Sequence, residues 1–86
     1  MTWQITQFDN LKSELTHFLE ENGIKDFFGV EGPYRGSKIC SFLIKKEEDH
    51  LIKDLQGKNN GFHEFWFSKS WELNTSIKYL VNCKKI

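Results

Sequence analysis

The chain contains no alanine, one proline and one arginine, against eleven lysines. It has two cysteines, too few for the disulfide framework of a small secreted scaffold. No stretch approaches the roughly 18 apolar residues of a membrane-spanning helix, and the first ten residues lack the basic and apolar regions of a signal peptide. We therefore expect a cytoplasmic protein without a membrane partner, in which Cys40 and Cys83 are reduced thiols buried as small apolar residues.

The chain also lacks net charge, because twelve acidic and twelve basic side chains cancel. A nucleic-acid-binding domain usually has a pI above about 9, whereas the pI of this chain is about 6.8. The neutral balance argues equally against an acidic mimic of DNA. The preference for lysine over arginine is typical of proteins from AT-rich bacterial or phage genomes, and we expect such an origin.

Aromatic residues are abundant: eight phenylalanines, three tryptophans and two tyrosines. A chain of 86 residues is expected to form a single domain spanning residues 1–86. A domain of this size buries only about 60% of the surface that its unfolded chain exposes. Because each aromatic side chain removes a large apolar area from water, we expect these residues to supply most of the core.

The first part of the chain predicts a strand followed by a helix. Residues 2–5 alternate polar and apolar, as in a short edge strand. Thr6 is a suitable helix N-cap, and the sequence Asn22-Gly23 predicts the end of the helix, with Gly23 in the left-handed conformation. Between them, apolar residues recur at helical spacing, and we expect Glu14 and the other charged residues on the solvent side.

The rest of the chain predicts three strands, over 24–31, 38–46 and 62–67, and a short amphipathic helix over 47–56. Residues 71–84 fit a strand by alternation and also fit a helix capped at Ser70; poor helix formers at 74–76 favour the strand. The fold class is therefore α+β: an antiparallel sheet of four to five strands with two helices. Its order is β-α-β-β-α-β plus a C-terminal element, as in the split β-α-β plan.

Residues 29–38, GVEGPYRGSK, hold three of the six glycines. A phosphate-binding loop has the pattern G-x-x-x-x-G-K-[ST] and leads from a strand into a helix. Here Gly32 and Gly36 are separated by three residues, Lys38 follows Ser37, and a strand is predicted next. The spacing and the context both argue against a phosphate-binding loop.

A hairpin turn explains the same stretch better. Pro33 suits the second position of a turn that starts at Gly32, and Gly36 can adopt positive φ before the next strand. This interpretation places Tyr34 and Arg35 at the tip of the hairpin. They are either ordinary solvated loop residues or, because tyrosine and arginine are enriched at binding hot spots, contacts for a partner.

No residue pattern predicts catalysis, a metal or a cofactor. His50 and His63 lie 13 residues apart, outside the usual ligand spacings of zinc sites. A Cys–His nucleophile would need an accessible thiolate, whereas both cysteines alternate with large apolar residues. The consecutive carboxylates at 47–49 are explained by the start of a helix. We expect a protein that is not an enzyme and has no cofactor.

The segment FHEFWF (62–67) and Trp71 predict aromatic side chains on a sheet face that helices leave uncovered. The favoured hypothesis is a small protein-binding module that occludes a partner protein, such as an inhibitor, antitoxin or immunity-type protein. Its expected anchors are Tyr34, Arg35, Trp66 and Trp71. Core packing of the same aromatic residues is the simpler alternative. The sequence leaves the identity of the partner open, and a strand at either end of the chain can pair with a second copy, so both a monomer and a homodimer remain open.

The alternative function is an RNA-binding or single-stranded nucleic-acid-binding module that uses the sheet aromatics. Its expected phosphate contacts are Lys38, Lys69, Lys78, Lys84 and Lys85. Glu64, within the aromatic strand, opposes this hypothesis because its carboxylate would repel phosphate. The two hypotheses differ in whether these lysines converge on one face.

Overall fold

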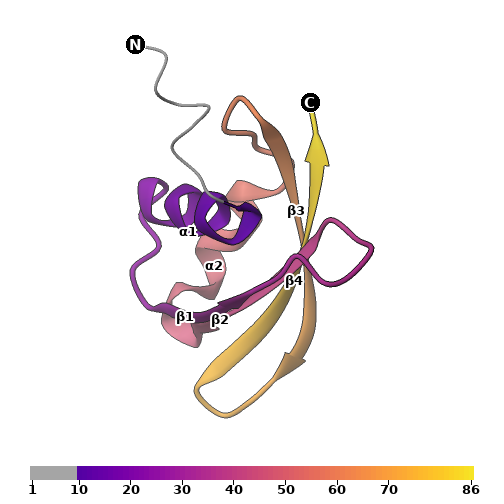
Figure 1. The fold of residues 1–86 in the computed structure, drawn as a ribbon. Helices are drawn as coiled ribbons and strands as arrows, with labels where there is room; N and C mark the ends of the chain where they lie inside the picture. The colour runs from indigo at the N-terminus through magenta and orange to yellow at the C-terminus, as the bar shows by residue number, and fades with distance from the viewer. Residues whose placement is uncertain (1–9) are drawn as a thin grey trace.

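The computed structural model describes residues 10–86 and shows α-β-β-α-β-β as the order of its elements (Figure 1). These are α1 (Leu11–Glu21), β1 (Phe27–Glu31), β2 (Ile39–Lys45), α2 (Asp49–Ile52), β3 (His63–Glu72) and β4 (Ser76–Lys85). Short 3-10 turns at Lys46–Glu48 and Lys53–Leu55 flank α2. The α+β class is confirmed, whereas the strand expected at 2–5 lies outside the described residues.

Helix α1 begins at Leu11, where the side chain of Asn10 accepts a hydrogen bond from the backbone N–H of Ser13 (2.9 Å). The prediction of Thr6 as the cap was therefore wrong. Asparagine is at least as good an N-cap as threonine, so both residues were suitable and the sequence did not distinguish them. The end of the helix agrees with the prediction, since Gly23 has φ of +86°.

The four strands form one antiparallel sheet in the order β1-β2-β4-β3. The strand interpretation of residues 71–84 is confirmed for the part that forms β4, and the helix capped at Ser70 is wrong because Ser70 belongs to β3. β4 lies between β2 and β3, so the C-terminal strand is not available as an edge. Every neighbouring pair of strands is antiparallel, as in the split β-α-β plan, and β4 separates β2 from β3, the two strands that α2 connects.

Both helices lie on one side of the sheet, and the loop between β1 and β2 projects on the other (Figure 1). We call the helix side the covered face and the opposite side the open face. The strand residues buried on the covered face are Cys40, Phe42, Ile44, Phe65, Phe67, Ile77, Tyr79, Val81 and Cys83. They pack with Leu15, Phe18 and Leu19 of α1 and with Ile52 and Leu55 from the segment around α2. Both cysteines are buried and unpaired, as expected.

The β3 edge is partly satisfied by the segment that follows α2. The side-chain amide of Gln56 donates to the carbonyl of Phe67 and its oxygen accepts from the N–H of Phe67, each at 2.7 Å. Gly57 donates to the carbonyl of Phe65, and the N–H of Phe65 donates to the carbonyl of Lys58 (both 2.9 Å). Within residues 10–86, no helix has the length and apolar character needed to cross a bilayer.

Candidate functional site

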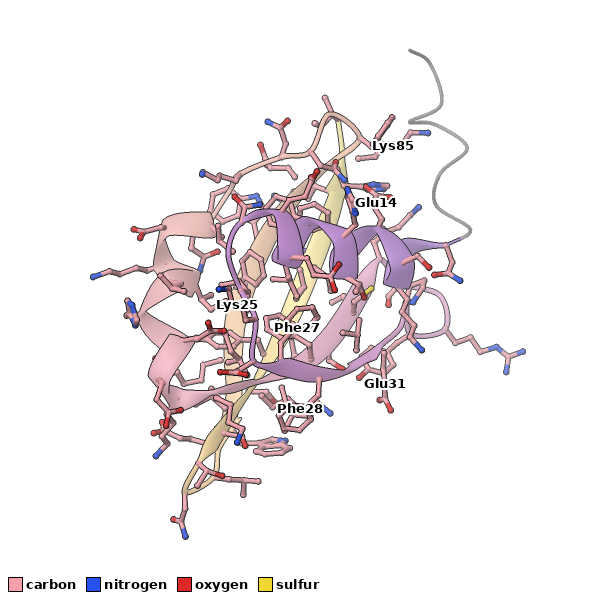
Figure 2. All side chains as sticks on the ribbon, turned by 90° about the vertical axis from the view of Figure 1, so that its left-hand side faces the viewer. Glu14, Lys25, Phe27, Phe28, Glu31 and Lys85 are labelled. Atoms are coloured by element: carbon pink, nitrogen blue, oxygen red, sulfur yellow. The ribbon has the colours of Figure 1, made fainter. Side chains whose placement is uncertain are left out.

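The open face carries a row of side chains that crosses all four strands. In antiparallel pairs, residues directly opposite each other point to the same face. Phe28 of β1 is opposite Leu43 of β2, Leu43 is opposite Lys78 of β4, and Lys78 is opposite Trp71 of β3. Phe27, the neighbour of Phe28, lies on the α1 side of β1, and Phe28 lies on the other (Figure 2). Phe28 and Trp71 are 46% and 43% exposed at the two ends of the row.

Trp66 lies on the same face, opposite Asn82. The residues opposite Trp66 and Trp71 are four positions apart on β4, so the two rows lie roughly 13 Å apart along the strand. Strict alternation would place Trp66 and Trp71 on opposite faces because they are five residues apart. A β-bulge between Lys69 and Trp71 inserts Ser70 and brings both indoles to the open face.

Contacts on several sides hold the Trp66 ring. Its Nε1 donates to Glu64 (2.8 Å), and the Lys84 ammonium lies 5.9 Å from the ring centroid. A Cβ placed on Gly57 would come within 3.0 Å of the ring, so the indole packs against a position that only glycine leaves open. Trp66 is nevertheless 42% exposed, which makes it a pre-organised apolar surface.

Lysine side chains accompany both indoles. The Lys78 ammonium lies 5.8 Å from the Trp71 ring centroid, and this contact resembles that of Lys84 with Trp66. Such cation–π contacts stabilise exposed sites by about 0.5–1 kcal/mol each. The open face therefore combines flat apolar rings with neighbouring positive charge.

The β1–β2 loop borders this face. Its turn starts at Tyr34, whose carbonyl accepts from the N–H of Ser37 (3.0 Å); the predicted start at Gly32 is wrong. Gly36 has φ of +73°, as expected, while the Gly32–Pro33 peptide is cis. The chain also approaches β2 too closely for a side chain at Gly32, since a Cβ there would lie 2.7 Å from the Cα of Cys40.

Tyr34 and Arg35 differ in how freely the loop presents them. The Tyr34 hydroxyl hydrogen-bonds Ser41 Oγ of β2, so the phenol packs down on the open face while remaining 40% exposed. Arg35 occupies the turn itself and is exposed. The structure thus places Tyr34, Trp66 and Trp71 on one face and Arg35 on the loop beside it.

The five lysines proposed as phosphate contacts do not converge. Lys78 and Lys84 lie on the open face, as their contacts with Trp71 and Trp66 show. The other three are on the covered side: Lys69 is opposite Tyr79, Lys85 is opposite His63, and Lys38 precedes β2 beside Cys83. Lys69 also lies 3.9 Å from the carboxylates of Asp49 and Glu72.

A buried polar cluster occupies the covered side near the start of α1. Glu14, expected on the solvent side of the helix, is buried instead, and the Oε2 atom of its carboxylate hydrogen-bonds Asn60 Nδ2 and His63 Nδ1 (both 2.8 Å). The spacing contained this signal: Glu14 is three residues after Leu11 and four before Phe18, both on the inner face. The solvent-side prediction was based on the charge of Glu14 and ignored its position in the helix.

The two thiols lie in the core and provide no accessible nucleophile. Hydrogen bonding with Cys40 and burial raise the pKa of Cys83, so this thiol stays protonated. The pKa of Cys40 is lowered, chiefly because Cys83 is its hydrogen-bond partner. Both side chains are fully buried. In the part of the chain that the structure describes, no three His, Cys, Asp or Glu residues are grouped to hold a metal ion.

Phe28 is the open-face residue that sequence analysis missed. The signal was the pair Phe27-Phe28 within a predicted strand, because adjacent strand residues point to opposite faces. With helices on one side only, one of the two rings had to be exposed. No protein-family model, curated protein or solved structure matches the chain, so its function is inferred from these contacts alone.

Proposed function

We propose that the protein is a non-catalytic binding module that occludes a partner protein with its open face, as an inhibitor, antitoxin or immunity-type protein does. The supporting observation is the exposure of Phe28, Trp66 and Trp71 on a single sheet face next to Tyr34. Exposed apolar patches of this kind mark interaction surfaces. The core cluster of residues 10–86 lies on the covered face and does not include these three rings.

The residue types on the open face are those that dominate binding energy in protein interfaces. Tryptophan, tyrosine and arginine are enriched among hot spots, where truncation costs about 2 kcal/mol or more. Trp66 is already fixed by Glu64 and Gly57, so little side-chain entropy is lost when a partner covers it. Arg35, exposed on the turn, can hold a carboxylate of the partner with two parallel hydrogen bonds.

The paired lysines give a second candidate function a specific basis. A cation beside a stacking ring, as at Lys78–Trp71 and Lys84–Trp66, suits a single nucleic-acid strand. Two observations favour a protein partner over this candidate. Three of the five lysines point away from the open face, and Glu64 lies directly beside Trp66. We further propose that the protein acts in the cytoplasm of a bacterium and is encoded by the bacterium or by a phage.

The test is an affinity capture from bacterial lysate with the tagged chain, carried out with and without nuclease. The double variant W66A/W71A is compared with K12Q/K53Q, whose lysines are exposed on the helices of the covered side. We expect one protein to remain bound after nuclease treatment, and its purified form to bind W66A/W71A at least about thirtyfold more weakly, from 2 kcal/mol or more of lost contacts. K12Q/K53Q should bind like the wild type.

Three results would contradict the proposal or narrow it. A captured protein that binds W66A/W71A as tightly as the wild type removes the open face from the site. If the tagged chain instead retains nucleic acid, seen as ultraviolet absorbance that disappears after nuclease treatment, and binds it much more weakly at high salt, the nucleic-acid function is supported over the protein partner. If R35A binds the partner as tightly as the wild type, the β1–β2 loop is not part of the binding site. R35A is preferable to Y34A for this test, because Y34A also breaks the hydrogen bond to Ser41.

A further inference from the structure

A cavity of about 750 Å³ opens at the end of the sheet, away from the open-face rows. The first turn of α1, the β1–β2 loop and the outer ends of β3 and β4 line it. Figure 2 shows Glu14 and Lys85 together at this end of the molecule. The volume falls within the roughly 300–1,000 Å³ range of small-molecule sites.

The Glu14 cluster supplies a fixed polar wall of the cavity. Glu14 and His63 line it with side chains that are 8% and 15% exposed. When its carboxylate is ionised, Glu14 only accepts hydrogen bonds, and His63 Nδ1 is then the donor in their 2.8 Å contact. The negative charge of Glu14 is thereby held by His63 and by the amide of Asn60.

Two lysines line the cavity together with the Glu14 carboxylate. Lys38, directly before β2, and Lys85 of the adjacent strand β4 both lie on the covered side. Neither forms an ion pair with a carboxylate among residues 10–86. The remaining walls include Leu11 and Pro33, which are apolar.

We propose that this cavity binds a small organic anion, in which one phosphate or carboxylate group is attached to an apolar body. The anionic group lies between the ammonium groups of Lys38 and Lys85, and the apolar body packs against Leu11 and Pro33. Phosphate and carboxylate share the chemistry that two lysines recognise, which is negative charge on oxygen. The site is independent of the open face, because its cations point to the opposite side of the sheet.

The experiment is an amide NMR titration of the full chain with phenyl phosphate and, separately, with benzoate. Phenol and inorganic phosphate serve as probes that carry only the apolar body or only the anion. We expect saturable shifts around Lys38, His63 and Lys85 for one or both aromatic anions, at least fivefold tighter than for phenol or inorganic phosphate. K38Q/K85Q should weaken binding at least tenfold, whereas K53Q/K58Q, which changes exposed lysines outside both the cavity and the open face, should not.

Each arm can overturn the proposal. Shifts that do not saturate with either aromatic anion exclude the site. If phenol bound as tightly as the aromatic anions, the cavity would be an apolar site without anion recognition. If inorganic phosphate bound as tightly as phenyl phosphate, the apolar body would contribute nothing to binding. Unchanged affinity in K38Q/K85Q would show that these two lysines do not contact the anion. W66A/W71A should bind the aromatic anions normally, so failure here and failure of the proposed function are separate results.

Discussion

Tyr79 illustrates how a single polar atom is placed at the edge of an aromatic core. Its ring stacks on Phe42, with centroids 5.8 Å apart, while its hydroxyl donates a hydrogen bond to the Asp49 carboxylate. Burial raises the pKa of Tyr79 above its ordinary value, and the hydrogen bond and the negative charge of Asp49 raise it further. The folded protein therefore keeps this phenol protonated at pH values where the unfolded chain loses the proton.

This difference predicts a loss of stability in alkali. The unfolded pKa of tyrosine is about 10, so the contribution of Tyr79 is complete below that pH. Above it the unfolded state binds fewer protons than the folded state, and the free energy of unfolding falls by up to about 1.4 kcal/mol per pH unit. Urea unfolding of the wild type and Tyr79→Phe between pH 8 and 11.5 measures this, with the variant declining less steeply. Parallel curves would show that Tyr79 ionises equally in both states.

Glu14 shows where residue-scale prediction from the sequence succeeded and where it did not. Helical spacing correctly assigned Leu15, Phe18 and Leu19 to the core, since periodicity is a local property. The same spacing also fits Glu14, which was wrongly predicted on the solvent side. A buried carboxylate is stable only with partners, and Asn60 and His63 are 46 and 49 residues away. Such long-range partners leave no mark in the neighbouring sequence.

At the scale of elements, the sequence predicted which segments form strands but not how the strands pair. Each strand predicted within residues 10–86 overlaps an observed one, because alternation and turn residues act within a few positions. The order β1-β2-β4-β3 depends on contacts between distant segments. The predicted site was affected in the same way: alternation put Trp66 on the face opposite Phe65 and Phe67 but did not say which face is open. Trp71 joins Trp66 only through the bulge at Ser70.

The bulge leads to a prediction about deletions in the sheet. Ser70 and Trp71 together face Lys78, so a chain without Ser70 still places Trp71 opposite Lys78 in a regular ladder. We expect deletion of Ser70 to change the free energy of unfolding by less than about 1 kcal/mol, close to the cost of a surface substitution. Deletion of Ser41 from β2, whose register with β4 has no bulge, shifts the pairing by one residue and turns one side of β2 to the wrong face, so it should cost several kcal/mol.

Urea unfolding of the two deletion variants, each lacking one serine of the sheet, compares these costs directly. An NMR cross-strand contact between Trp71 and Lys78 in the Ser70 deletion would verify the register. Equal destabilisation by both deletions, or loss of that contact, would show that the bulge is required for the strand to pair with β4.

At the scale of the whole molecule, one apolar cluster joins α1, the segment around α2 and the inner side of the sheet. The open face adds large exposed rings to this small molecule without adding to the cluster. The proposed function therefore separates stability and partner binding onto the two sides of one sheet. Substitutions on the open face are expected to change partner affinity with little effect on unfolding, and substitutions on the covered face are expected to do the reverse.

The two buried thiols test whether this cluster unfolds as one unit. Cys40 and Cys83 lie on the adjacent central strands β2 and β4 and are fully buried, so a thiol reagent reaches them only when the sheet opens. The variants C40S and C83S each leave one thiol to follow with an aromatic disulfide reagent. Under conditions where closing is faster than labelling, each rate reports the free energy of the opening that exposes that sulfur.

We expect both rates to match the global free energy of unfolding that urea gives for the same variant. Every 1.4 kcal/mol of lost stability should then accelerate labelling about tenfold. If Cys83 reacted much faster than global unfolding allows while Cys40 did not, β4 would open without β2, and the covered face would consist of two units. Agreement at both positions means that β2 and β4 open only when the whole cluster does, and that the open face rests on a single cooperative scaffold.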